Sequence, residues 1–283
     1  MRHPLRTAAL LLVLGAWFTP AAAQGDAKRG EYLAKAGGCH GCHTDAKEGA
    51  VAYAGGRALK TPFGTFYGPN ITPHPQAGIG RWSEADFVRA MRHGRRPDGA
   101  NYFPAFPYPS FTGIRDNDLR DLWAYLRTLP ASSQASREHD LWFFFGWRFL
   151  VTVWKWFFFT PGPVVDAPGV PELVNRGAYL VQALAHCSEC HTPRNFLGGP
   201  KTSRFLAGGK GPEGNDVPNL TPTGLKKWSD KELRDFLVLG TTPDGDFPEE
   251  TMAEVINKTT SQLTSQDLAA MIAYLRALPP LPD

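Results

Sequence analysis

All four cysteines of this 283-residue chain fall into two copies of one five-residue pattern. The copies are Cys39-His40-Gly41-Cys42-His43 and Cys187-Ser188-Glu189-Cys190-His191. In such a pattern two thiols add to the two vinyl groups of one porphyrin, and the adjacent histidine lies beneath the iron as its proximal ligand. The spacing therefore predicts two covalently bound haem c groups, attached through the four cysteines and ligated by His43 and His191.

Other uses of cysteine fit this arrangement less well. An even number of cysteines in an exported chain usually indicates disulfides, and one Cys-x-x-Cys pair can be a redox dithiol or half of a zinc site. A zinc site would need another ligand beside each copy, and nothing else recurs there. We therefore interpret both copies as haem attachment sites.

The first 23 residues have the pattern of a signal peptide. A basic start at Arg2 and Arg6 precedes a short apolar run, and three alanines that end at Ala23 offer a cleavage site. The run is short for a membrane span, although a retained anchor helix is the alternative. We expect cleavage near Ala23 and export to the periplasm. Removal of the two arginines lowers the formal net charge from +3 to +1, so nothing supports nucleic-acid binding.

An internal repeat surrounds the two motifs and predicts two domains. The matched stretches are Arg29 to Leu33 with Arg176 to Leu180, Pro69 to Pro73 with Pro218 to Pro222, Trp82-Ser83 with Trp228-Ser229, Pro97 to Gly99 with Pro243 to Gly245, and Ala124 to Arg127 with Ala273 to Arg276. Self-similarity of this kind indicates tandem units. We place the first domain at 24–130, a linker at 131–172 and the second domain at 173–283.

Apolar periodicity indicates that both domains are helical. Apolar residues recur at helical spacing over 119–129 and over 268–278, and each pattern ends at a proline. Ser229 begins a capping box and Ser83 a near version of it. No convincing strand alternation is present. We predict an all-α fold in which each domain has a helix leading into the haem motif, a middle helix, and a C-terminal helix packed across the first.

This arrangement resembles the class I cytochrome c fold. In that fold, the carbonyl of a proline in a Pro-Asn-Leu or Pro-Asn-Ile stretch accepts a hydrogen bond from the proximal histidine. The resemblance implies that Pro69 serves His43 and that Pro218 serves His191. Such contacts fix the orientation and basicity of a metal-bound imidazole.

The same resemblance suggests partners for the haem propionates. A tryptophan at the start of the middle helix often reaches a propionate, which implies that role for Trp82 and Trp228; ordinary core packing is the alternative. Arg89, Arg92 and Arg96 recur at helical spacing and could also reach propionates or steer an acidic partner. For these arginines we favour a solvated helix face.

The sixth iron ligand is where the two halves of the repeat differ. A methionine normally supplies it in this fold, and Met252 lies at the matching position of the second domain; a buried core methionine is the alternative. The first domain has Phe106 at the same distance past the shared Asp-Gly, and phenylalanine cannot coordinate iron. The first haem is therefore five-coordinate or takes another ligand. Met91 and His93 are the nearest candidates, and we assign neither.

Longer stretches resemble one group of proteins. They are 61–73, 78–83, 89–92, 187–195 and 219–229. These stretches are similar to the multihaem cytochrome c subunits of bacterial membrane-associated alcohol, gluconate and related dehydrogenases, and the resemblance covers nearly the whole mature chain. Many relatives carry a third haem and a C-terminal membrane-binding helix, whereas this chain ends at Asp283. Many also have a methionine where Phe106 stands.

The resemblance implies a function in electron transfer. Such subunits receive electrons from a periplasmic substrate-oxidising dehydrogenase and pass them to another cytochrome, a quinone pathway or a terminal oxidase. No catalytic residue is assigned on this interpretation. The alternative is a haem enzyme in which an open first haem binds peroxide or another small molecule. No local set of acid and base residues accompanies Phe106 in support of it.

The predicted linker contains an aromatic-rich segment at 141–160. Its length could span a bilayer, but Arg148 and Lys155 near its middle would make that costly. We expect it to pack between the domains or to form a docking surface for a partner. A peripheral membrane contact is the alternative.

Overall fold

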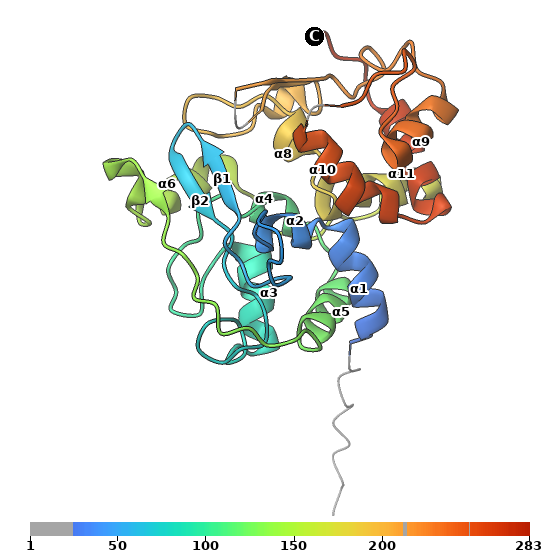
Figure 1. Cartoon of the computed structure of the whole chain (residues 1–283). Helices are drawn as coiled ribbons and strands as arrows, with labels where there is room; N and C mark the ends of the chain where they lie inside the picture. The colour runs from blue at the N-terminus through green and yellow to red at the C-terminus, as the bar shows by residue number, and fades with distance from the viewer. Residues whose placement is uncertain (1–24, 212–213, 249) are drawn as a thin grey trace, which may run out of the picture.

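The computed structural model describes residues 25–211, 214–248 and 250–283, which form two helical domains lying against each other (Figure 1). The predicted signal peptide lies outside these residues. The first domain contains α1 (Ala27–Ala36), α2 (Cys39–His43), β1 (Ala58–Thr61), β2 (Gly64–Tyr67), α3 (Glu84–His93), α4 (Tyr108–Phe111) and α5 (Asp116–Leu126). The connecting segment contains β3 (Asp140–Leu141), a 3₁₀ turn (Phe143–Gly146) and α6 (Leu150–Phe158). The second domain contains α7 (Glu172–Tyr179), a π-helical turn (Leu180–Leu184), α8 (Ser188–His191), a 3₁₀ turn (Thr202–Arg204), β4 (Gly209–Lys210), β5 (Asp216–Val217), α9 (Asp230–Leu239), α10 (Glu250–Lys258), a 3₁₀ turn (Thr260–Gln262) and α11 (Ser265–Ala277).

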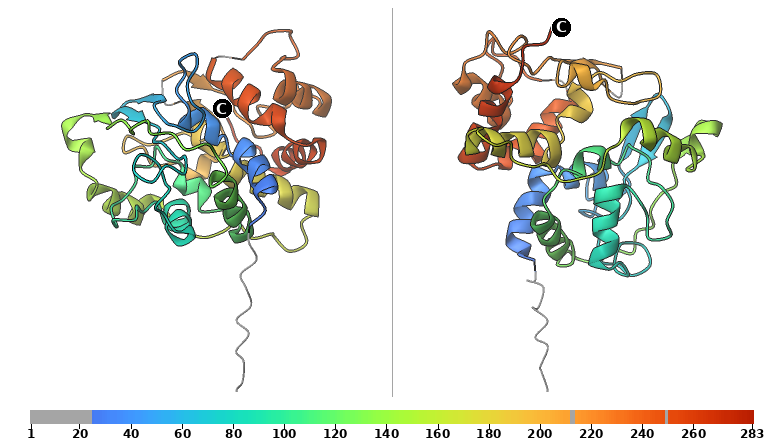
Figure 2. Two further views of the ribbon diagram at one scale, coloured as in Figure 1. Left: turned by 60° about the horizontal axis from the view of Figure 1, so that its bottom comes forward. Right: turned by 180° about the vertical axis from the view of Figure 1, so that it is seen from behind.

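The first and last helices of each domain cross at a glycine. In the first domain α1 packs against α5, and in the second α7 packs against α11 (Figure 2). A Cβ atom on Gly30 would lie 1.9 Å from the carbonyl oxygen of Asp121, and one on Gly177 would lie 1.9 Å from that of Ala270. Because only glycine permits such a close approach of two backbones, the Arg-Gly-x-Tyr-Leu stretch of the repeat fixes both crossing points.

The middle helices have the same signals at both ends. Ser83 before α3 and Ser229 before α9 each form a complete capping box with the acidic residue three positions further on. Each helix then ends at a left-handed glycine, Gly94 with φ 56° and Gly240 with φ 76°. The near capping box expected at Ser83 is therefore a full one.

The prediction of a purely α fold is wrong in its detail. β1 and β2 form an antiparallel hairpin in which Leu59 lies opposite Phe66, and β3 adds to it with Leu141 opposite Gly64. β4 and β5 form a second small antiparallel pair. Each strand is two to four residues long, so alternation along the sequence is too brief to stand out from loop composition.

The aromatic-rich segment packs against both domains. The Lys155 ammonium on α6 is buried and donates to the Gly94 carbonyl and to Oδ1 of Asn101, at 2.9 Å each. On the other side, the indole Nε1 of Trp154 donates to the carbonyl oxygen of Leu197 in the second domain at 3.0 Å. Within the part of the chain that the structure describes, no helix is both long and apolar enough to cross a bilayer.

The two domains share one apolar core. Buried side chains of α1, α3 and α5 form a continuous cluster with those of α7, α9 and α11. The contact is close at the end of α1, where a Cβ atom on Gly37 would lie 3.5 Å from a methyl carbon of Leu184. The relative position of the domains is thus fixed by packing as well as by the connecting segment.

Candidate haem sites

The first Cys-x-x-Cys-His motif forms α2, directly after α1. A left-handed residue, Gly38 with φ 63°, turns the chain between the two helices. The thiols of Cys39 and Cys42 are free and half-buried. Burial raises the pKa of Cys39 to about 12 and that of Cys42 to about 11.

The second motif forms α8 in equivalent surroundings. It follows a π-helical turn and the left-handed residue His186, with φ 43°, neither of which the sequence signalled. Cys187 and Cys190 are again free and half-buried. Burial raises the pKa of Cys187 to about 12 and also raises that of Cys190.

Each motif histidine has one ring nitrogen engaged by a proline carbonyl. Nδ1 of His43 lies 2.8 Å from the Pro69 oxygen, and Nδ1 of His191 lies 2.9 Å from the Pro218 oxygen. These are the two prolines that the sequence nominated. Desolvation lowers the pKa of both imidazoles, which favours the neutral ring that a metal ligand requires. The Nε2 atoms are the nitrogens left for iron, so the ligand roles of both histidines remain consistent predictions.

The donor set fits covalent haem. Each motif presents two free thiols and an imidazole whose Nδ1 is already held by a backbone carbonyl. Over 25–211, 214–248 and 250–283, no group of three or more His, Cys, Asp and Glu side chains gathers in a way that could hold a metal ion without a porphyrin. Bound haem would supply reversible one-electron chemistry, and the polypeptide would attach, orient and shield it.

The tryptophans lie where the middle helices begin. Trp82 and Trp228 are half-buried and pack against the shared core directly before the capping serines. The Trp228 ring also meets Phe236 edge-on at 5.3 Å. This position combines core packing with a partly exposed ring, and the propionate role of both residues stays a prediction.

The solvated face expected for the basic residues of α3 is wrong for one of them. Arg92 is buried, and its Nη2 lies 2.6 Å from Oδ1 of Asp116 at the start of α5. Arg89 pairs with Asp86 one turn earlier at 2.6 Å, and Arg96 remains partly exposed. Arg92 thus ties the middle helix to the last one, a structural role that helical spacing alone does not reveal.

The distal segment of the second domain is a helix. Met252 lies on α10, and its half-buried side chain packs against the shared core. Ile256, one turn further along, is buried. Met252 therefore points to the interior side of α10, where a distal ligand is needed, and its coordination of iron stays a prediction.

The distal segment of the first domain is aromatic. The Phe106 ring meets Tyr102 at 5.3 Å and Phe111 at 5.8 Å, in edge-on geometry. Met91, on α3, is buried in the shared core, in keeping with a packing role. His93 is exposed at the end of that helix. The structure thus surrounds Phe106 with aromatic rings, and it assigns neither Met91 nor His93 as a ligand.

Polar contacts between the domains repeat with approximate two-fold symmetry. The Tyr32 hydroxyl of the first domain donates to Oδ2 of Asp267 in the second at 2.6 Å, and the Tyr179 hydroxyl of the second donates to Asp118 in the first. Each aspartate also pairs with the arginine of the repeat in its own domain. The repeat contained these tyrosines, but no pattern along the chain indicates that each one reaches across to the other domain.

The distal segment of each domain contacts the attachment motif of the other. A carboxylate oxygen of Glu254, on α10, lies 3.8 Å from where a Cβ on Gly41 would be. In the reverse direction, the Ser110 hydroxyl on α4 donates to Oε1 of Glu189 at 2.5 Å. Gly41 and Glu189 occupy the same place in their motifs, two residues after the first cysteine. Both predicted haem sites therefore border a single interface.

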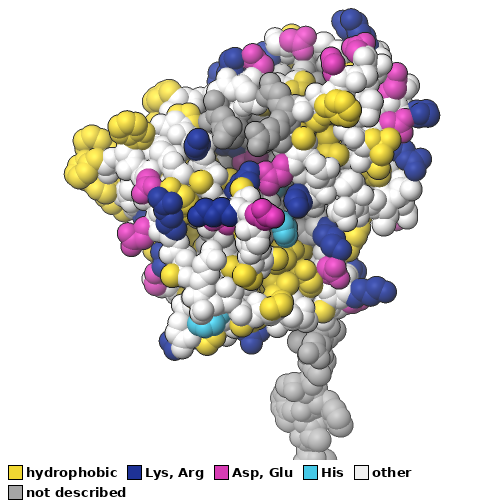
Figure 3. All heavy atoms as spheres, viewed as in Figure 1, with side chains coloured by type: hydrophobic (Ala, Val, Ile, Leu, Met, Phe, Trp, Pro, Cys, Tyr) yellow, Lys and Arg dark blue, Asp and Glu magenta, His cyan; other side chains and the backbone are white. Residues whose placement is uncertain are grey.

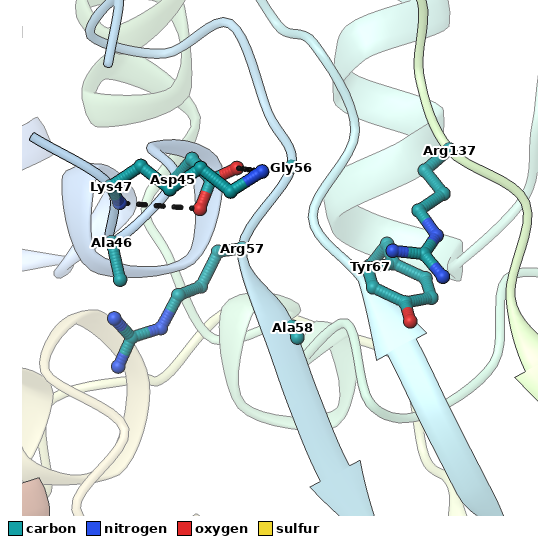
Figure 4. A pocket seen from close by; sticks show the side chains of 8 residues that line it. All are labelled: Asp45, Ala46, Lys47, Gly56, Arg57, Ala58, Tyr67 and Arg137. Atoms are coloured by element: carbon teal, nitrogen blue, oxygen red, sulfur yellow. Dashed lines mark hydrogen bonds and ion pairs between the residues drawn. The ribbon is translucent and has the colours of Figure 1, made fainter. Parts of the chain in front are cut away.

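A surface pocket lies near the first motif but belongs to neither haem site. It encloses about 250 Å³ and is lined in part by Asp45, Arg57, Tyr67 and Arg137 (Figure 4). The Arg137 guanidinium lies over the Tyr67 ring at 3.9 Å. None of the predicted site residues lines this pocket.

Comparisons with known proteins agree with this geometry. The family model for cytochrome c matches residues 27–130 and 174–279. A diheme cytochrome c-type protein of Cereibacter sphaeroides is 44% identical over 99% of both chains. The cytochrome subunit of fructose dehydrogenase from Gluconobacter japonicus is 39% identical over 92% of this chain, and the cytochrome c subunit of gluconate 2-dehydrogenase from Pantoea cypripedii is 36% identical over 95%.

The extent of these matches differs. The chain spans nearly the whole Cereibacter protein but only 54% of the fructose dehydrogenase cytochrome and 64% of the gluconate 2-dehydrogenase cytochrome. Two family matches, each enclosing one Cys-x-x-Cys-His motif, together with a diheme relative show that the chain carries two covalently bound haem c groups. With an attachment site in each half and relatives of this kind, the chain belongs to the cytochrome c family.

Proposed function

We propose that this protein relays electrons in the periplasm, from a substrate-oxidising dehydrogenase to a downstream acceptor. Several relatives are named as cytochrome subunits of fructose, alcohol and gluconate dehydrogenases, which supports a dehydrogenase as electron donor. The acceptor would be another cytochrome, a quinone pathway or a terminal oxidase. The two covalent haems and the dehydrogenase relatives make electron transfer the chemistry that is best supported.

The observation that supports a relay most directly is that both attachment motifs lie at the interface between the two domains. Each motif touches the distal segment of the other domain. Two redox groups held at one buried interface can exchange electrons within the molecule. A carrier that accepts electrons at one surface and donates them at another can then transfer electrons while both haems stay attached.

Pulse reduction of the purified diheme protein tests this proposal. One electron per molecule is delivered by a radiolysis pulse, and the absorbance of each haem is followed with time. We expect a phase in which electrons redistribute between the two haems of one molecule, at a rate that does not depend on protein concentration. Redistribution that occurs only through collisions between molecules, at a rate proportional to concentration, would contradict an internal relay.

Export is tested separately. The signal peptide lies outside the described residues, and its pattern supports cleavage near Ala23. The intact mass of the haem-loaded protein from a periplasmic extract should match a chain that begins just after Ala23. Retention of residues 1–23 on a membrane-bound form would contradict cleavage.

The exposed aromatic surface of the connecting segment supports contact with a membrane. We define this surface as the six side chains that are 64% to 76% exposed: Trp142, Phe143, Phe144, Phe149, Trp156 and Phe157. It protrudes with α6 from one side of the molecule as an apolar surface (Figures 1 and 3). A convex group of tryptophan and phenylalanine rings suits insertion among lipid headgroups.

Charge beside the aromatic surface fits an anionic lipid layer. No acidic residue occurs between Leu141 and Phe159. The exposed Arg95 forms an isolated β-bridge with Asn101, whose side chain donates to the Thr152 hydroxyl of α6 at 2.8 Å. Cationic groups next to a lipid-facing aromatic surface add attraction to anionic headgroups.

Vesicle sedimentation tests the membrane contact. The haem-loaded protein is mixed with phosphatidylcholine vesicles, with and without phosphatidylglycerol. We expect binding that falls several-fold in Trp156→Ser/Phe157→Ser. Phe196→Ser/Phe247→Ser is the matched control, because those rings are 87% and 76% exposed elsewhere. Absence of binding would contradict the proposal, and loss of self-association in the first variant would instead assign the surface to a second copy.

A further inference from the structure

The helix α10 has two functional faces. Met252 and Ile256 point toward the core of the second domain, where Met252 is the expected distal ligand. Glu254 lies two residues after Met252, and residues two apart on a helix project in roughly opposite directions. Its carboxylate accordingly faces the first domain, above Gly41 of the first attachment motif.

An ion pair joins this outer face of α10 to the first domain. Nη2 of Arg57 lies 2.5 Å from Oε2 of Glu254. The two side chains are 27% and 30% exposed, so the pair is partly shielded from water and is less weakened by it than a fully exposed pair. In Figure 4 the Arg57 guanidinium turns away from Tyr67 and Arg137, leaving it available to the second domain.

Within the described residues, α10 also contacts α2 of the first domain and α9 of the second. The stretch before it contains Asp244, Gly245 and Phe247, all exposed, so the helix follows a loop with little packing of its own. After the helix, the Thr260 hydroxyl donates to the Leu237 carbonyl at 2.5 Å and anchors only its far end. The first turn, which carries Met252, therefore depends on core packing from inside and on the cross-domain pair from outside.

We propose that Arg57 and Glu254 are a positioning pair that fixes the placement of α10, and with it the position of Met252 at the second haem. A residue of the first domain would thus govern the distal ligation of the haem in the second. This inference rests on Met252 being that ligand. Neither Arg57 nor Glu254 would touch iron; both would act through the placement of the helix.

The opposite contact offers a comparison within the same molecule. Ser110 of the first distal segment donates to Glu189 of the second motif, but Phe106 in that segment has no donor atom for iron. Breaking that contact should leave iron–methionine ligation unchanged. The positioning effect is therefore expected in one direction only, from the first domain to the second haem.

Spectroscopy and redox titration of the haem-loaded protein test the pair. The ferric iron–methionine charge-transfer band and both midpoint potentials are measured for wild type, Arg57→Ala, Glu254→Gln, and the charge-swapped double variant Arg57→Glu/Glu254→Arg. We expect each single variant to lose the band several-fold and to lower one midpoint potential while the other stays constant. The charge swap should restore much of both signals.

The controls separate positioning from loss of fold. Lys210→Ala breaks an exposed 2.7 Å pair with Asp216 in the second domain, and Ser110→Ala breaks the opposite contact; both should keep the band. Arg57→Lys retains the charge and should give an intermediate result if Arg57→Ala does not fold. An unchanged band and unchanged potentials in the single variants would overturn the proposal.

The variant Met252→Ala tests the premise that Met252 is the distal ligand of the second haem. If this variant keeps the band, Met252 is not the ligand and the positioning proposal fails with it. The relay is judged independently by the pulse experiment, because internal electron exchange does not require methionine as the sixth ligand. Failure of the inference and failure of the proposed function are thus recorded by different measurements.

Discussion

The two domains share a frame and differ in their distal segments. In both, a glycine sets the crossing of the first and last helices, a capped middle helix follows a tryptophan, and a proline carbonyl holds the motif histidine. The first distal segment then forms the short α4 within an aromatic cluster around Phe106, and the second forms the longer α10 with Met252. The two domains therefore agree at the helix crossings and at the residues that attach and hold the haem. They differ in the distal segment, which supplies the sixth iron ligand.

The largest effect should follow from removing one attachment site at a time. Cys187→Ala/Cys190→Ala and Cys39→Ala/Cys42→Ala each delete both thioether bonds of one haem, so covalent haem per chain should fall to half. Pyridine haemochrome assay against protein concentration measures this ratio. If one variant loses both haems, the two domains are not independent in maturation and the comparison between them fails at that step.

The second-largest effect should follow from exchanging the distal residues Met252 and Phe106. Met252→Phe removes the expected ligand and should lower one midpoint potential by an amount on the order of 0.1 V, within the roughly 0.8 V range that axial ligands span. It should also convert the second haem from low spin to high spin. Phe106→Met should do the reverse at the first haem.

Electron paramagnetic resonance measures this exchange, together with carbon monoxide binding. Wild type should show one high-spin and one low-spin ferric haem, and after reduction carbon monoxide should bind the first haem only. Two low-spin haems in wild type would mean that a residue other than Phe106 closes the first site. His93→Ala and Met91→Leu would then identify it.

The helix crossings should be equally sensitive in both domains. Gly30→Ala and Gly177→Ala each place a Cβ 1.9 Å from a carbonyl oxygen, so the helices must separate. We expect each to destabilise the protein by about 3 kcal/mol, the upper part of the range for overpacking. Denaturant unfolding measures the loss, and Gly146→Ala, with nothing within 4 Å, is the control. Unequal costs would show that one crossing tolerates separation.

The two tyrosines that reach across to the other domain should differ modestly in how much they stabilise the protein. Tyr179→Phe removes a buried hydrogen bond to Asp118, and Tyr32→Phe removes a less buried one to Asp267. Hydrogen bonds to charged groups contribute about 1.5–3 kcal/mol, so Tyr179→Phe should be the more destabilising of the two. Thermal unfolding provides the measurement, with Tyr67→Phe, which acts within the first domain and its adjoining segment, as control. The reverse order would contradict burial as the cause.

The smallest effect concerns acid pH. Burial pushes the pKa of Asp267 upward, but hydrogen bonds from Arg176 and Tyr32 outweigh it and hold that pKa below its usual value. A carboxyl with a lowered folded pKa stabilises the protein above its unfolded pKa, about 3.9, and loses that contribution as pH falls through the folded value. The stability difference between wild type and Asp267→Asn should therefore shrink below about pH 4. A difference that stays constant with pH would contradict this linkage.

Much of each haem site could be predicted from local sequence. The attachment cysteines, motif histidines, capping serines and repeat boundaries depend on residues a few positions apart, and the proline contacts follow from resemblance to a known fold. The short strands were missed because two to four residues give too little alternation. Arg92 was misjudged because helical spacing shows which residues share a face but not what covers that face.

The sequence by itself determined that this chain attaches two haems in two repeated domains, since covalent attachment and helix signals are written in short motifs. Only the tertiary structure decided how the domains meet: Tyr32 reaches Asp267 across 235 positions, and Arg57 reaches Glu254 across 197. Such pairs have no spacing rule along the chain. They exist because apolar faces of both domains close into one core, and that packing selects which polar groups come together.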